Sequence, residues 1–78
     1  MNLPLSDELR KTWVAILGAK DIDEDSDFFR LGGNHRLAVD LVRRLNEKLS
    51  LGVTLREVAE HRRYGQQLEL LRARTSFK

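Results

Sequence analysis

Two histidines and a group of aspartates are the residues best able to do chemistry in this 78-residue chain. His35 follows the pair Gly32-Gly33, and His61 lies far along the chain. A helical metal site places its two histidines one turn apart, and the sequence also lacks cysteine, another common zinc ligand. The sequence therefore predicts neither a metal centre nor a disulfide framework.

The acidic segment offers a second candidate site, for calcium. Asp21, Asp23 and Asp25 have the spacing of the first, third and fifth ligands of a calcium-binding loop. Such a loop also needs glycine at its sixth position and a bidentate glutamate at its twelfth, where this chain has Ser26 and Gly32. A calcium loop is therefore not expected.

Catalytic and nucleotide-binding patterns are also missing around the glycine pair. No serine or cysteine follows Gly32-Gly33 that a neighbouring histidine could activate, and the lysine of a phosphate-binding loop is absent. A chain this short has little room for a deep pocket that excludes water. We therefore expect a non-catalytic binding module.

Length and composition bound the fold class. Hydrophobic residues make up 41% and charged residues 33% of the chain, which is ordinary for a folded domain. We expect one domain over residues 1–78 with an ordered core at about 5–74, stand-alone if Met1 is its native start. The sequence shows neither an export signal nor an apolar run long enough to span a bilayer, so we expect a cytoplasmic protein without membrane contact.

Charge is small in total but unevenly placed. The formal net charge is +2, with acids gathered in residues 19–34 and basic residues in 35–63. An acidic loop and a basic helical surface follow from this pattern. Binding of nucleic acid through Arg43 and Arg44 is one alternative function. Acidic residues on the same helix dilute its positive charge, which is not typical of a nucleic-acid recognition surface.

Apolar spacing predicts an all-α fold of four helices. The expected helices cover residues 7–17, 35–50, 55–61 and 64–74, and residues 76–78 are predicted to fray. Ser6 and Asn34 are candidate N-caps, and Thr54 with Glu57 forms a capping-box pattern. The result is a bundle of three longer helices and one short helix.

A long loop, from Gly18 to Asn34, separates the first two helices. A loop of this length in a compact domain is usually functional, and its apolar residues Ile22, Phe28 and Leu31 predict that it is pinned to the core. The expected core comprises Trp13, Phe28, Leu41, Leu45, Val58 and Leu68. At the end of the loop, two glycines and a capping asparagine predict a sharp turn that presents position 35 to solvent.

Four sequence runs together carry a resemblance to a known family. They are Trp13-Val14-Ala15-Ile16-Leu17-Gly18, Asp25-Ser26-Asp27-Phe28-Phe29-Arg30-Leu31-Gly32-Gly33, Leu37-Ala38-Val39 and Thr54-Leu55-Arg56-Glu57-Val58. From about residue 5 to 72 the chain resembles the peptidyl carrier proteins, which are the thiolation domains of nonribosomal peptide synthetases. The resemblance implies an acyl-carrier-protein-like four-helix bundle, a 4'-phosphopantetheine cofactor, and adenylation or condensation domains as partners.

The chain departs from this family at one decisive position. Family members carry the cofactor on a serine directly after the turn that is Leu31-Gly32-Gly33-Asn34 here, and the serine position is His35. Attack by imidazole on coenzyme A would give a readily hydrolysed phosphoramidate, from a nitrogen placed farther from the backbone than a serine oxygen. We therefore expect no cofactor at position 35.

These observations predict a monomeric carrier-like module that docks on biosynthetic enzymes without a covalent arm. A runner-up is an ordinary peptidyl carrier, tethering aminoacyl thioesters, whose serine has been replaced by histidine. Core packing is the favoured role of Leu37 and Val58 among the candidate contacts. The candidate partner-binding residues are Asn34, His35, Arg36, Leu37, Val39, Arg43 and Val58.

Overall fold

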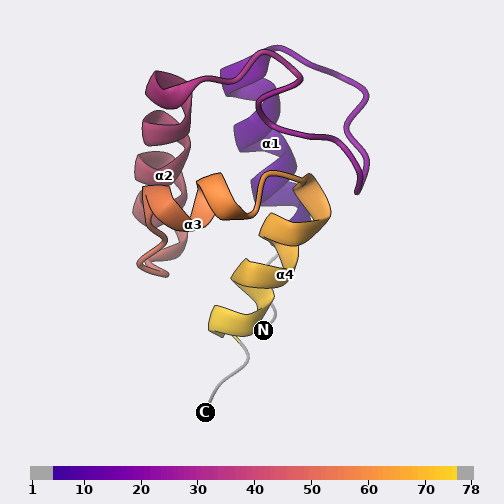
Figure 1. The fold of residues 1–78 in the computed structure, drawn as a ribbon. Helices are drawn as coiled ribbons and strands as arrows, with labels where there is room; N and C mark the ends of the chain where they lie inside the picture. Colours follow the sequence, from indigo (N-terminus) through magenta and orange to yellow (C-terminus); the bar gives the residue numbers. More distant parts are fainter. Residues whose placement is uncertain (1–4, 76–78) are drawn as a thin grey trace.

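The computed structural model describes residues 5–75, and within them the chain forms four helices (Figure 1). The helices are α1 (Leu5–Leu17), α2 (His35–Leu49), α3 (Leu55–Glu60) and α4 (Tyr64–Thr75). Each begins and ends within two residues of its predicted bounds, and the all-α prediction is confirmed. The predicted fraying of residues 76–78 lies outside the described part. None of the described helices is long and apolar enough to cross a membrane.

The start of α1 corrects one prediction. Ser6 was expected to cap this helix from outside, but α1 already begins at Leu5. The Ser6 hydroxyl instead lies 3.0 Å from the hydroxyl of Tyr64, which in turn donates to the Ser6 carbonyl at 2.7 Å. A tertiary contact with α4 therefore takes the oxygen that a local cap would have used.

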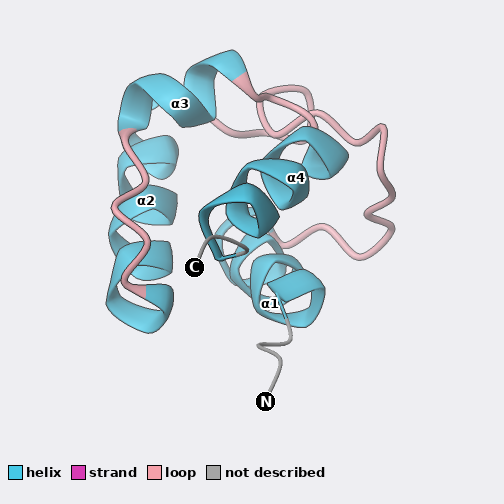
Figure 2. Cartoon of the chain, turned by 90° about the horizontal axis from the view of Figure 1, so that it is seen from below, coloured by secondary structure: helices cyan, strands magenta, loops and turns pink. Residues whose placement is uncertain are grey.

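The core lies between α1 and its two neighbours, α2 and α4 (Figure 2). Trp13 of α1 is fully buried and makes edge-to-face ring contacts with Phe28 at 5.3 Å and Tyr64 at 5.4 Å between centroids. Such contacts add to the apolar area that the rings bury. All six residues predicted for the core, namely Trp13, Phe28, Leu41, Leu45, Val58 and Leu68, are buried.

The long loop between α1 and α2 is held by the connection between α3 and α4. The Phe28 N–H donates to the Arg62 carbonyl at 2.9 Å, and the Tyr64 N–H donates to the Ser26 carbonyl at 2.8 Å. The two segments form an isolated antiparallel bridge between Asp27 and Arg63. The predicted anchoring is confirmed, since Ile22 and Phe28 are buried and Leu31 is partly buried against the core.

Candidate functional site

The first turn of α2 is fixed by Asn34. This residue has extended backbone angles (φ −150°, ψ −176°), and its side-chain oxygen accepts the Leu37 N–H at 2.9 Å. Its carbonyl accepts the Ala38 N–H at 2.8 Å. The predicted cap is confirmed, and it leaves the side chains of His35 and Arg36 exposed at the helix start.

The two glycines before the cap are required for different reasons. Gly32 has φ +110°, in the region that side-chain-bearing residues rarely adopt. Gly33 lies so close to Phe28 that a Cβ there would be 2.5 Å from two ring carbons and 2.6 Å from the carbonyl oxygen. A glycine pair was expected to allow both positive φ and close backbone approach, and here Gly32 has the positive φ while Gly33 makes the close approach.

Asp27 organises the turn, a role that the sequence patterns above did not indicate. One of its carboxylate oxygens accepts the N–H groups of Phe29 at 2.8 Å and Arg30 at 3.3 Å. Its carbonyl accepts the Leu31 N–H at 3.0 Å. Aspartate commonly bonds the backbone two residues ahead in turns, so its place before the phenylalanine pair was the available signal.

Arg62, in the connection between α3 and α4, supports the same turn with its side chain. Its guanidinium lies 3.3 Å from the second carboxylate oxygen of Asp27 and 5.2 Å from the centroid of the Phe29 ring. A cation over an aromatic face is attracted by the negative charge density of the ring. The α3–α4 connection therefore holds the loop with side chains as well as with its backbone.

A shallow groove of about 490 Å³ runs along the exposed side of α2 beside position 35. Val39 in this groove is 45% exposed, which is high for a large aliphatic side chain. Five of the seven predicted contact residues line the groove, and His35 stands exposed next to it. The groove is lined by Asn34, Arg36, Leu37, Val39, Asp40 and Arg43.

Val58 is the predicted contact residue that lies elsewhere. It is 1% exposed and belongs to the core, so its side chain is not available on the surface. The core role that we favoured for it is correct, and the contact role is wrong. Leu37 is half-buried, packing on the core while also lining the groove.

Charge along the groove is positive towards the start of α2. Asp40 is shared by two cations, with its oxygens 2.5 Å from Arg43 and 3.1 Å from Arg44. Arg36 has no ion-pair partner among residues 5–75. The groove is lined by two guanidinium groups, those of Arg36 and Arg43, and by one carboxylate, that of Asp40. Its lining therefore has net positive charge, although Glu47 also lies 3.6 Å from Arg43.

In the acidic loop, the side chain of Asp23 bonds within the loop itself. A carboxylate oxygen of Asp23 accepts the Asp25 N–H at 2.9 Å and lies 3.2 Å from the Ser26 hydroxyl. Among residues 5–75, no three histidine, cysteine or acidic side chains come together as metal ligands. The geometry of this loop is that of a hydrogen-bonded turn.

The side chain at position 35 is an imidazole, and residues 31–37 contain no hydroxyl. Of the described serines, Ser6 contacts Tyr64, Ser26 bonds within the loop, and Ser50 caps the far end of α2. A cofactor attached as a phosphate ester needs a hydroxyl at the start of α2. The residues present there do not fit such an attachment.

Comparison with known proteins agrees with this fold and turn. Residues 7–71 match the family described as "Phosphopantetheine attachment site". A linear gramicidin synthase protein from Brevibacillus parabrevis is 35% identical, over 96% of this chain and 2% of the relative. The nonribosomal peptide synthetase gliP from Aspergillus fumigatus is 32% identical, over 87% of this chain and 4% of the relative.

A third relative is cyclo-acetoacetyl-L-tryptophan synthase from Aspergillus oryzae, which is 41% identical over 65% of this chain and 1% of its own length. The chain thus spans only a few per cent of the relatives that it matches. Its four helices and the turn before α2 define a carrier-type domain. The chain belongs to the phosphopantetheine-attachment family, whose domains carry 4'-phosphopantetheine and tether intermediates without catalysing their reactions.

Proposed function

We propose that this chain is a carrier-type module of nonribosomal peptide or related biosynthesis that is not loaded at position 35. It acts by docking on synthetase domains through the groove of α2 and the turn before it. The observation that carries the proposal is the contrast at the start of α2. The backbone of the turn is fully formed, yet the side chain that it presents is the imidazole of His35.

The docking part is supported by the exposed residues around that turn. Arg36 offers an unpaired charge, and Val39 offers exposed apolar area between two arginines. Apolar contact ringed by charge is typical of protein interfaces, where the charges set partner choice. Adenylation and condensation domains with an acidic rim around an apolar patch are the partners that fit this surface.

Loading is tested by intact-protein mass spectrometry. The unchanged chain and a His35→Ser variant are incubated with coenzyme A and a phosphopantetheinyl transferase of broad specificity. We expect the unchanged chain to keep its mass and His35→Ser to gain one phosphopantetheine group. His35→Ala is the matched control, because it removes the imidazole without supplying a hydroxyl.

The outcomes separate the proposal from the ordinary-carrier alternative. A mass gain in the unchanged chain contradicts the proposal directly. Efficient loading of His35→Ser would show that the transferase still recognises the surrounding surface. If loading needs Arg36→Leu as well, the surface has also diverged, which favours a separate docking role.

Docking is tested with purified adenylation and condensation domains by titration calorimetry. We expect Arg36→Glu to weaken binding at least about tenfold, because it reverses a charge that faces the partner. Arg72→Glu on α4 is the matched control, since it changes the net charge equally on an exposed residue away from the groove. An equal loss of binding affinity in both variants would contradict specific docking at the groove.

A further inference from the structure

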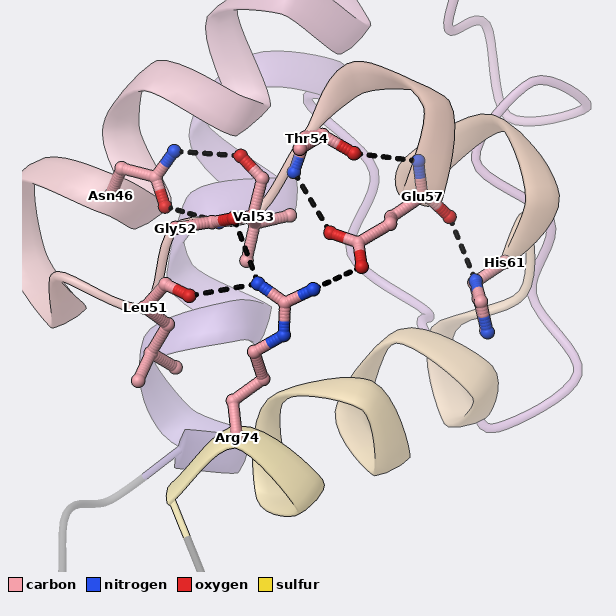
Figure 3. A network of polar contacts seen from close by, with 8 residues as sticks. All are labelled: Asn46, Leu51, Gly52, Val53, Thr54, Glu57, His61 and Arg74. Carbon is pink, nitrogen blue, oxygen red and sulfur yellow. Dashed lines mark hydrogen bonds and ion pairs between the residues drawn. The ribbon is translucent and has the colours of Figure 1, made fainter.

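The last turn of α4 is tied to the connection between α2 and α3, which we call the elbow and define as residues 50–54. Arg74 makes this tie with one side chain (Figure 3). One guanidinium nitrogen donates to the Leu51 carbonyl at 2.9 Å and to the Gly52 carbonyl at 2.8 Å. The other pairs with a carboxylate oxygen of Glu57 in α3.

Glu57 also closes the capping box at the start of α3. Its other carboxylate oxygen accepts the Thr54 N–H at 3.0 Å, and its own N–H donates to the Thr54 hydroxyl at 3.1 Å. Its carbonyl lies 2.8 Å from the Nδ1 atom of His61 at the end of the helix. The carboxylate that Arg74 holds is therefore part of the capping box that fixes the first turn of α3.

The elbow has no regular structure of its own. Ser50 and Gly52 have positive φ values of 55° and 67°. Asn46 of α2 spans the elbow by accepting the Val53 N–H and donating to the Val53 carbonyl, both at 2.8 Å. The elbow is thus held from α2 by Asn46, from α3 by Glu57 and from α4 by Arg74.

Helix packing shows why this tie matters. The main packing partners are α1 with α2, α1 with α4, and α2 with α3. Helix α3 covers only six residues and contributes one fully buried side chain, Val58. With Val58 and partly buried Leu55 as its packing residues, α3 has a small apolar face, so polar contacts can contribute more to its orientation than in the longer helices.

We propose that Arg74 is a positioning residue that couples the end of α4 to the orientation of α3 relative to α2. A change at the last turn of α4 is thereby transmitted to α3, on the opposite side of the elbow. The coupling is partly electrostatic because it joins a guanidinium to a carboxylate, and salt can reach the pair because the side chains of Arg74 and Glu57 are 31% and 23% exposed. Salt therefore weakens it without breaking the apolar core.

The test compares Arg74→Gln with Arg72→Gln, which removes an exposed arginine from the same turn of α4. Amide hydrogen exchange is followed for each helix by NMR. In Arg74→Gln we expect the amides of α3 and the elbow to exchange on the order of tenfold faster, because bonds to a charged group are lost. Those of α1 and α2 keep their rates, as do all helices in Arg72→Gln.

A second variant and a second readout separate positioning from general stability. Glu57→Gln keeps an oxygen for the Thr54 N–H but removes the charge facing Arg74, so the double variant should exchange no faster than Arg74→Gln alone. Residual dipolar couplings should show α3 rotated relative to α2 in Arg74→Gln, and restored in Arg74→Lys. Unchanged α3 exchange, or equal acceleration in all helices, overturns the proposal, and neither depends on whether position 35 is loaded.

Discussion

At position 35 the backbone is set by residues other than His35 itself. Asn34 caps the helix, Gly32 takes the positive φ, and Asp27 binds the N–H groups of the turn. None of these contacts uses the side chain at 35, which points to solvent. A histidine can therefore stand at this position without distorting the turn, and its chemistry can change independently of the fold.

The requirement for glycine at position 33 leads to a prediction for a single substitution. Gly33→Ala should lower the free energy of unfolding by about 1–3 kcal/mol, because its Cβ overlaps the Phe28 ring. Displacing Phe28 disturbs Trp13, whose ring lies 5.3 Å away. Urea unfolding measures the stability, and the indole N–H shift of Trp13 reports the displacement.

Gly32→Ala is the matched control for this prediction. It is strained by its φ of +110°, but a Cβ there meets nothing within 4 Å. Gly32→Ala should lower the free energy of unfolding but leave the chemical shift of the Trp13 indole N–H unchanged. A Trp13 shift of equal size in both variants would show that the core senses the backbone of the turn rather than the contact at Gly33.

At the scale of elements, α3 depends more on its cap than the longer helices do. Its capping box closes two of the few hydrogen bonds available to six residues. Thr54→Ala should cost about 0.5–2 kcal/mol of unfolding free energy, since the N-cap hydroxyl is lost. Chemical denaturation followed by circular dichroism measures the change.

Thr54→Ser keeps the hydroxyl and should unfold within about 0.5 kcal/mol of the unchanged chain. If the serine variant is as unstable as the alanine variant, the methyl group of Thr54 is responsible and the capping argument fails. The comparison therefore shows whether Thr54 stabilises the helix through packing of its methyl group or through the hydrogen bond of its hydroxyl.

Whether a contact could be predicted from the sequence depends on how far apart its residues lie along the chain. Helix bounds, the Asn34 cap and the Thr54 capping box involve residues three or four apart, so local patterns were enough. The ties made by Arg62 and Arg74 join segments far apart in the chain. Their pairings depend on how the helices pack, which no local pattern encodes, and exposed arginines look alike in sequence.

The misassigned cap at Ser6 has the same cause. Ser6 has the right type and place for a cap, but tertiary contact with Tyr64 outweighs the local preference. Val58 was expected in the core from its apolar spacing and was also a candidate contact through the family resemblance, and its burial agrees with the first expectation. For the site, residue type predicted the exposed positions on α2, whereas the groove that joins them needed the fold.

At the scale of the whole molecule, a buried contact between Trp13 and Gln67 joins α1 to α4, in addition to the partly buried contact between Ser6 and Tyr64. The Trp13 indole N–H donates to the side-chain oxygen of Gln67 at 3.0 Å, and Gln67 is 2% exposed. The amide nitrogen of Gln67 has no hydrogen-bond partner among residues 5–75. Removing either partner leaves a buried polar atom unpaired, which is costly in a thin core.

A double-mutant cycle tests this contact. Trp13→Phe should destabilise the chain by about 2–3 kcal/mol, through lost volume and an unpaired Gln67 oxygen. Gln67→Leu should lower the free energy of unfolding by about 1–2 kcal/mol, because the indole N–H is left without a hydrogen-bond acceptor. We expect the double variant to be about 1 kcal/mol more stable than the sum predicts, measured by thermal and urea unfolding.

A strictly additive result would show that the hydrogen bond contributes nothing beyond the volumes of its two side chains. Gln67→Met is a useful control, because it keeps a long flexible side chain without a strong acceptor. It should behave like Gln67→Leu if hydrogen bonding is what matters.

The pairing of the long loop with the α3–α4 connection also sets an order of events during synthesis. Glu24, Ser26 and Phe28 bond to residues 62–65, which leave the ribosome well after position 35. Until that later segment has emerged, the loop lacks its backbone partners, and contacts between distant segments form late. The segment that leads into the turn before α2 is therefore fully held only once residues 62–65 have been made.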